Sequence, residues 1–300
     1  MDEPAQHAPA LLSLTQGRLL IAVGALLWST SGAFTKVLTK DTFLHLGSPQ
    51  VPGLLIAFYR VLFAGLVLLP TLRRCDFSFR RAMIAMVACF ATMNALYVLA
   101  MAQGKAANAV LLQYTAPMWM YLASICWLRE PADRRSSVAL VIGLVGIGVI
   151  VSDGWQEAQL PIAAIALGSG VAYAGVILFL RILRHASPRW LTVLNHLGGA
   201  LVLVPFLFFA LPPSPTLLQL GVLFVFGSLQ MALPYWLVAR GLRVVSPQEA
   251  GTITLLEPLL NPVWAYLVAP ESEVPSRLTL IGGLFIIGAL AWRYWPRKAT

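Results

Sequence analysis

Long apolar runs separated by short polar stretches dominate the pattern along the chain. A membrane-spanning helix needs roughly 20 mostly apolar residues, whereas the strands of a membrane barrel alternate in polarity over short segments. The runs here are unbroken and long enough for a helix, so the pattern predicts helical spans. Ten spans are expected, at residues 19–38, 51–71, 82–102, 107–127, 137–152, 160–181, 189–210, 217–239, 247–268 and 278–295.

Composition supports the same class. Of the 300 residues, 59% are hydrophobic and 11% are charged, against about 45–50% and about 25% in soluble domains. The mean hydropathy is +0.79. A soluble fold of this composition would have too little polar surface to cover its core. We therefore predict an all-α integral membrane protein whose surroundings are the lipid bilayer.

The charged residues predict the orientation of the spans. The net charge of +9 does not indicate nucleic-acid binding, because the basic residues lie in short clusters between apolar spans. Cytoplasmic loops of membrane proteins are enriched in Lys and Arg. In this chain every second loop is rich in these residues. Examples are Arg73, Arg74, Arg80 and Arg81 in the second loop and Arg129, Arg134 and Arg135 in the fourth. We expect both termini in the cytoplasm, no cleavable signal in residues 1–17, and a multi-pass protein of a bacterial-type inner (plasma) membrane.

The two halves of the chain share a weak repeat. An offset of 141 positions pairs Ala109 with Ala250, Pro117 with Pro258 and Glu130 with Glu271, and a slightly different offset pairs Trp28 with Tyr173 and Lys36 with Arg181. Five spans per half is an odd number, so the halves would insert with opposite orientation. This predicts two five-helix repeats, 1–152 and 153–300, related by inversion around a central cavity, an arrangement frequent in transporters.

These features resemble the drug/metabolite transporter superfamily, EamA type. The resemblance rests on the ten spans, the inverted repeat, the sequence GALLW at Gly24–Trp28, and the proline and glutamate residues near the ends of the fourth and ninth spans. Within that superfamily the chain is most similar to the YddG-type exporters of aromatic amino acids. The resemblance implies ten helices around a central cavity that is lined by the fourth and ninth spans.

Motifs of enzymes and metal sites are absent from the sequence. There is no H-E-x-x-H, G-x-S-x-G or P-loop pattern, and no His, Cys or Asp cluster has metal-ligand spacing. The three cysteines have no pairing pattern. We expect neither catalysis nor a cofactor nor a metal. Glycines in the fifth and tenth spans suit close helix packing in lipid, and these two spans are expected to be the least involved in a pathway.

Glu257 is the most unusual residue of the apolar runs, because a carboxylate within a span is costly and commonly faces a cavity or a partner. It could couple transport to protons or bind the ammonium group of a substrate. It could also form a structural ion pair with Arg60, the arginine near the middle of the second span. The equivalent position in the first half is Ala116, so the acid has no repeat-related counterpart.

Prolines interrupt the same two spans. Pro117, Pro258 and Pro262 deprive their helices of backbone donors, which frees carbonyl groups and weakens the helix. We expect hinges at these positions, with kinks that serve only packing as the alternative. His196, which aligns with Arg60, could titrate near neutral pH or be hydrogen-bonded within the bundle.

Aromatic and amide side chains are spread over the inner parts of the spans rather than their ends. The expected cavity residues are Trp28, Asn94, Tyr97, Gln113, Tyr114, Tyr173, His196, Gln230, Tyr235 and Asn261. Aromatic walls with a few polar groups suit an amphipathic organic molecule, which they could hold by stacking or cation–π attraction. Core packing is the alternative for each residue taken alone.

The sequence therefore predicts a secondary transporter that exports amino-acid-like small molecules, aromatic or otherwise apolar, by alternating access. Efflux of cationic drugs or other metabolites is the alternative within transport. A membrane protein that does not transport is the alternative outside it. Proton coupling is expected if Glu257 titrates, and the sequence does not indicate an oligomeric state.

Overall fold

A computed structural model of the chain describes residues 12–127, 129–156, 159–210 and 214–295, and all the regular elements in these ranges are helical. The all-α class is therefore confirmed. The first half contains α1 (Leu14–Ser29), α2 (Ser31–Thr39), α3 (Gly53–Leu68), the short η1 (Leu69–Thr71) and η2 (Arg74–Asp76), α4 (Arg81–Gln103), α5 (Ala106–Gln113), α6 (Ala116–Cys126) and α7 (Arg134–Gln156).

The described part of the second half is also helical. Its elements are α8 (Leu160–Ile182), α9 (Pro188–Ala210), α10 (Leu217–Val225), the π-helical η3 (Phe226–Ala232), α11 (Leu233–Gly241), α12 (Pro247–Thr254), α13 (Leu256–Val268) and α14 (Arg277–Tyr294).

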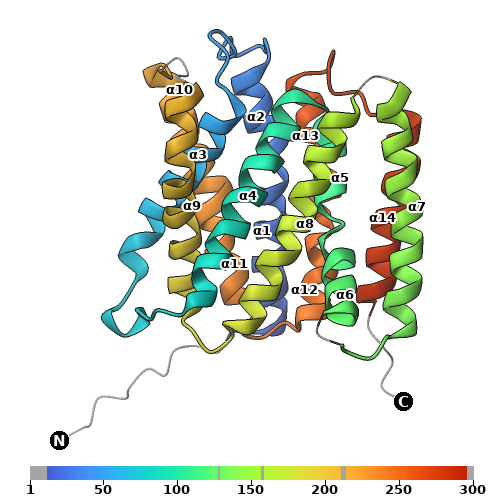
Figure 1. The fold of residues 1–300 in the computed structure, drawn as a ribbon. Helices are drawn as coiled ribbons and strands as arrows, with labels where there is room; N and C mark the ends of the chain where they lie inside the picture. The colour runs from blue at the N-terminus through green and yellow to red at the C-terminus, as the bar shows by residue number, and fades with distance from the viewer. Residues whose placement is uncertain (1–11, 128, 157–158, 211–213, 296–300) are drawn as a thin grey trace, which may run out of the picture.

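Nine helices of the described ranges are long and apolar enough to cross a membrane. They coincide with nine of the ten expected spans, and four of those spans consist of consecutive helical elements, such as α1 and α2 on either side of Thr30. The expected span at 247–268 is divided at Leu255 into α12 and α13 and is not one of the nine. These two helices nevertheless follow one another across the thickness of the bundle (Figure 1).

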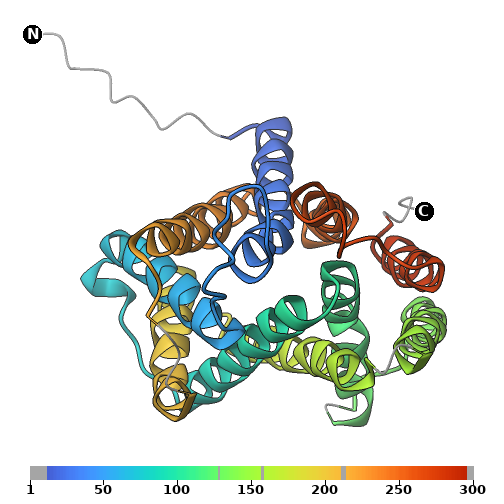
Figure 2. The same cartoon turned by 90° about the horizontal axis from the view of Figure 1, so that it is seen from above.

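The helices pack mainly across the two halves of the chain. Helix α4 contacts α8, α3 contacts α9, α1 contacts α11, and α7 contacts α14. Figure 2, which looks along the bundle, shows α7 and α14 side by side at one edge and the other helices gathered around the middle. The arrangement suits the expected repeats at 1–152 and 153–300, whose boundaries and inverted relation stay predictions.

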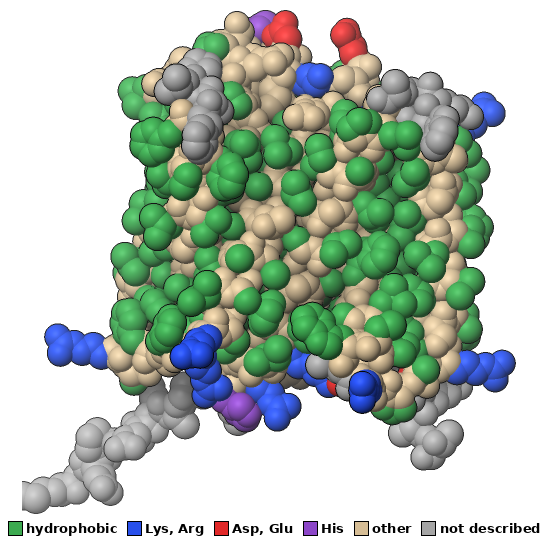
Figure 3. Space-filling model, in the orientation of Figure 1, with side chains coloured by type: hydrophobic (Ala, Val, Ile, Leu, Met, Phe, Trp, Pro, Cys, Tyr) green, Lys and Arg blue, Asp and Glu red, His purple; other side chains and the backbone are tan. Residues whose placement is uncertain are grey.

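Both ends of the described chain lie on one face of the bundle, which we call the terminal face (Figure 1). In the view of Figure 3, Lys and Arg side chains gather mostly along this face, and apolar side chains cover the band between it and the opposite, distal face. Many large apolar side chains are exposed on the outer sides of the helices, for example Leu201, Phe208 and Leu284. An apolar band of this kind suits contact with lipid.

Glycines bring α7 and α14 into close contact. A Cβ atom added at Gly146 would lie 2.7 Å from the carbonyl oxygen of Gly282 and 2.9 Å from a carbon of Ile286. Gly148, two residues further along α7, has nothing within 4 Å of such an atom. The close approach therefore depends on Gly146 and not on every glycine of the helix.

We predict that Gly146→Leu destabilises the protein by about 1–3 kcal/mol, because the added side chain must separate two packed backbones. The measurement is the thermal unfolding temperature in detergent. Gly148→Leu adds the same side chain where there is open space and is the control. Equal unfolding temperatures for the two variants would contradict the packing assignment.

Candidate functional site

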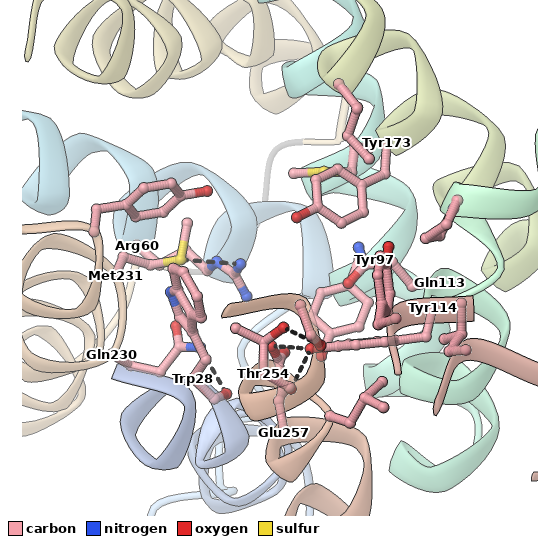
Figure 4. Close-up of a pocket in the computed structure, with 18 residues that line it drawn as sticks. Trp28, Arg60, Tyr97, Gln113, Tyr114, Tyr173, Gln230, Met231, Thr254 and Glu257 are labelled. Carbon is pink, nitrogen blue, oxygen red and sulfur yellow. Dashed lines mark hydrogen bonds between the residues drawn. The ribbon is translucent and has the colours of Figure 1, made fainter. Parts of the chain in front are cut away.

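A cavity of about 170 Å³ lies in the middle of the bundle (Figure 4). Six aromatic side chains line it: Trp28, Tyr97, Tyr114, Tyr173, Tyr235 and Tyr294. The polar lining consists of Arg60, Gln113, Gln230, Thr254 and Glu257, and the remaining lining of Met93, Pro117, Ile177, Met231, Gly251, Leu255 and Leu290. The wall is therefore aromatic, with one cation and one acid.

Most of the side chains expected at the site are brought together here. Seven of the ten expected cavity residues line the cavity, namely Trp28, Tyr97, Gln113, Tyr114, Tyr173, Gln230 and Tyr235. Arg60, Glu257 and Pro117 line it too. The Trp28 and Tyr235 rings meet edge to face with centroids 5.3 Å apart, so the wall is continuous between α1 and α11.

Three expected cavity residues lie outside the lining. Asn94 is buried and its Nδ2 donates to the Ala57 carbonyl oxygen at 2.9 Å, which ties α4 to α3. His196 is fully buried with Nδ1 2.7 Å from the Thr192 carbonyl oxygen, and its ring lies behind Tyr235. Asn261 is fully buried on the distal side of Glu257. One polar atom of each is engaged in helix packing, while Asn94 Oδ1, His196 Nε2 and Asn261 Oδ1 have no hydrogen-bond partner in the described chain.

The fourth and ninth spans both break beside the cavity. Helix α5 ends at Gln113 and α6 begins at Ala116, while α12 ends at Thr254 and α13 begins at Leu256. Pro117 and Pro258 lie just after these breaks and cannot donate to the carbonyl groups four residues earlier, those of Gln113 and Thr254. Both breaks therefore lie at cavity-lining residues, Gln113 and Thr254, whose carbonyl oxygens lose their usual helical donor.

Tyr114 joins the two broken spans. Its hydroxyl lies 3.0 Å from the Thr254 carbonyl oxygen and 2.8 Å from Glu257 Oε2, so its single proton is shared between them (Figure 4). The tyrosine thus satisfies the carbonyl that Pro258 leaves free and holds one oxygen of the carboxylate. Pro262 lies inside α13. The hinge role of Pro117, Pro258 and Pro262 stays a prediction.

Arg60 is buried without an acidic partner. Its side chain is 4% exposed, and the guanidinium lies 5.7 Å from the Tyr97 ring centre and 5.2 Å from that of Phe226. Nη2 contacts the Met231 sulfur at 3.3 Å, whereas Nε and Nη1 have no hydrogen-bond partner within the described chain. Cation–π attraction offsets part of the cost of burial. The structural ion pair that the sequence analysis considered between Arg60 and Glu257 is not formed among the described residues.

Arg60 and Glu257 face the same space from different helices. Arg60 comes from α3 and Glu257 from α13, with the aromatic residues between and around them (Figure 4). Unlike Arg60, Glu257 is partly exposed, and this exposure is toward the cavity. The arrangement can bind an anionic group near Arg60, a cationic group near Glu257 and an apolar body against the rings.

Some of the lining was missed by the sequence analysis. The tenth span was expected to be among the least involved in a pathway, yet Leu290 and Tyr294 of α14 line the cavity. Tyr294 lies between Trp292, which is 54% exposed, and Trp295, which is 65% exposed. From the sequence, these three aromatic residues resemble a cluster at the membrane interface. The four-residue spacing of Leu290 and Tyr294 places them on one helix face, which was the available signal.

Comparison with known families gives a match over both halves. Residues 15–152 and 160–294 each match the profile of the EamA-like transporter family.

Relatives align over nearly the whole chain. An uncharacterized transporter of Archaeoglobus fulgidus is 26% identical over 92% of this chain and 96% of its own length. The pseudopaline exporter CntI of Pseudomonas aeruginosa is 26% identical over 86% of this chain and 94% of its own length. The uncharacterized transporter YwfM of Bacillus subtilis is 24% identical over 93% of this chain and 94% of its own length.

A solved crystal structure shares the fold. It superposes with a TM-score of 0.64 at 17% identity, covering 94% of this chain and 98% of the other. At this identity the likeness concerns the fold alone.

Proposed function

Because the chain belongs to the EamA-like transporter family, we propose that it is a secondary transporter that exports amino acids with aromatic or other apolar side chains by alternating access. The chain is a transporter and not an enzyme, as its named relatives also are. What the proposal adds is the substrate class, the direction and the mechanism.

The observation that carries the proposal is the pair of opposite charges in one aromatic cavity. A buried guanidinium forms strong, often bidentate hydrogen bonds with a carboxylate, and two nitrogens of Arg60 have no partner in the described chain. Glu257 and the neighbouring rings suit an ammonium group. An amino acid carries both groups on one carbon, and its side chain can lie against Trp28, Tyr173 and Tyr235.

The size of the cavity supports a small substrate. Ligand pockets for drug-sized molecules are commonly about 300–1,000 Å³, and this cavity is about 170 Å³. Efflux of cationic drugs remains the second candidate, favoured by Glu257 and the aromatic wall. Arg60 disfavours it, since a buried cation in the same cavity repels a substrate whose only charge is positive.

Export of a metabolite is also supported by one relative, the pseudopaline exporter. Because Arg60 and Glu257 would suit any small zwitterion, this relative supports export rather than a particular transported molecule.

We place the terminal face in the cytoplasm of a bacterial-type inner membrane, with both chain ends inside. The gathering of Lys and Arg along that face in Figure 3 supports this orientation. Substrate would then enter from the terminal face and leave at the distal face.

The experiment is flux through liposomes that contain the purified protein. Labelled phenylalanine, methionine and threonine are loaded inside, and their exit is followed against protein-free liposomes. We expect phenylalanine and methionine to leave faster than threonine, because the apolar side chains gain more from the aromatic wall. No flux above protein-free liposomes for any of the three would overturn the proposal.

We predict that Glu257→Gln lowers the flux of the transported amino acid by about tenfold or more, since a charge-assisted hydrogen bond contributes about 1.5–3 kcal/mol. The variant should also flatten the dependence of flux on pH, because an amide does not exchange a proton. Glu271→Gln removes an exposed acid at the end of the same span and is the control. A pH profile identical to that of the parent would mean that Glu257 does not couple protons.

A further inference from the structure

A buried ion pair lies at the distal end of the bundle, outside the cavity lining. Lys36 Nζ is 2.6 Å from Glu273 Oε1, and the two side chains are 1% and 2% exposed. Lys36 is in the last turn of α2, and Glu273 is in the connection between α13 and α14. The pair therefore joins the first spanning segment of one half to the fourth of the other half.

The connection between α4 and α5 completes this cluster. Lys36 Nζ also donates to the Gly104 carbonyl oxygen at 2.6 Å, and Glu273 Oε2 accepts the Ala106 backbone N–H at 2.8 Å. Each charge thus has a backbone partner in addition to the opposite charge. Such extra hydrogen bonds help to offset the cost of burying an ion pair.

Between this pair and the cavity the helices are tightly closed. A Cβ atom added at Gly32 would lie 3.1 Å from that of Ala106 and 3.2 Å from that of Ala265, so α2, α5 and α13 meet without a gap. Nearer the cavity, Asn261 Nδ2 donates to Ser31 Oγ at 2.8 Å, and Ser31 shares a 2.9 Å hydrogen bond with the Tyr97 hydroxyl. A substrate in the cavity cannot reach the distal face unless these layers separate.

A second cross-half ion pair lies on the terminal face. Arg181 donates to both oxygens of Glu130, at 2.7 and 3.2 Å, and the side chains are 53% and 37% exposed. Arg181 is in the last turn of α8, the first spanning helix of the second half, and Glu130 follows the fourth span of the first half. The two pairs therefore have the same construction with the halves exchanged.

We propose that Lys36 and Glu273 form the gate of the distal face, which must separate for the cavity to open there, and that Arg181 and Glu130 are its counterpart on the terminal face. The inference rests on the proposed function, because a gate presupposes a transported substrate. In the conformation described both pairs are formed, the distal pair fully buried and the Arg181–Glu130 pair partly exposed.

A gate formed by a buried ion pair should respond to single and double substitutions in a way that ordinary packing contacts would not. Removing one partner leaves the other charge buried and uncompensated, so the open state, in which that charge is hydrated, gains population. Replacing both partners by apolar residues removes both charges and favours the closed state. Single and double variants should therefore move the equilibrium in opposite directions.

The experiment uses a cysteine reporter at Ala265, which is fully buried beneath the pair. The three native cysteines are replaced by alanine, Ala265→Cys is introduced, and the rate of reaction with a membrane-impermeant thiol reagent added at the distal face is measured. We expect Lys36→Gln and Glu273→Gln each to accelerate labelling by about tenfold or more, the shift that 1.4 kcal/mol gives. Lys36→Met combined with Glu273→Leu should label at the parental rate or more slowly.

A control separates the gate from a merely structural contact. Glu271→Gln removes an exposed charge two residues from Glu273 and should leave the rate unchanged. If one single variant fails to fold, the other single variant is compared with the apolar double variant. Unchanged labelling in the single variants, or equal acceleration in the single and apolar double variants, would overturn the gate.

The labelling assay needs no substrate, so its result tests the gate separately from the proposal that amino acids are transported. If no amino acid is transported but the labelling pattern appears, the gate stands and the substrate class is wrong. If amino acids are transported but the single variants label at the parental rate, the function stands and the gate is wrong.

Discussion

In hydrocarbon, every backbone amide and carbonyl must find a partner inside the protein, and the broken helices beside the cavity depend on how this requirement is met. Pro258 leaves the Thr254 carbonyl without its helical donor, and the Tyr114 hydroxyl from the other half takes that place at 3.0 Å. The same hydroxyl holds Glu257 at 2.8 Å. One side chain thus allows the ninth span to break, places an acid in the cavity, and ties the two halves together at the site.

Two kinds of buried charge follow from this arrangement. At the distal end, Lys36 and Glu273 are paired with each other at 2.6 Å, and each also bonds to a backbone group, so they hold this end of the bundle closed. In the cavity, Arg60 and Glu257 are not paired with each other, and each keeps capacity for a further partner. Because an isolated charge in the membrane is costly, this difference is the physical basis for assigning binding to one pair and gating to the other.

Much of this could be predicted from the sequence. Apolar runs of helical length predicted ten spans, and nine of them coincide with long apolar helices of the described ranges. The exception is the span at 247–268, which carries an acid, an amide and prolines and is divided into α12 and α13. The cavity wall was largely predictable too, because an aromatic or amide residue in the middle of a span has few roles other than lining or packing.

The contacts themselves were not predictable. Tyr114 and Glu257 are 143 residues apart, and their meeting depends on two helix breaks in the three-dimensional fold. The repeat singled out Glu271, but the buried acid is Glu273, because the chain turns after α13 and Glu273 N–H bonds to the Ala269 carbonyl oxygen. Asn94, His196 and Asn261 are residue types common in binding sites, but in the fold Asn94 and Asn261 bond to neighbouring helices and His196 bonds within α9. Tyr294 was overlooked because its neighbours Trp292 and Trp295 are exposed aromatics.

The central claim is that Arg60 and Glu257 bind the two charged groups of one molecule at once. Calorimetric titration of the purified protein with phenylalanine, phenethylamine and 3-phenylpropionate tests it directly, since the second ligand lacks the carboxylate and the third lacks the ammonium group. The account predicts that phenylalanine binds about tenfold or more tightly than either, since each charged contact contributes about 1.5–3 kcal/mol. Phenethylamine binding as tightly as phenylalanine would contradict it and would favour a transporter of cations.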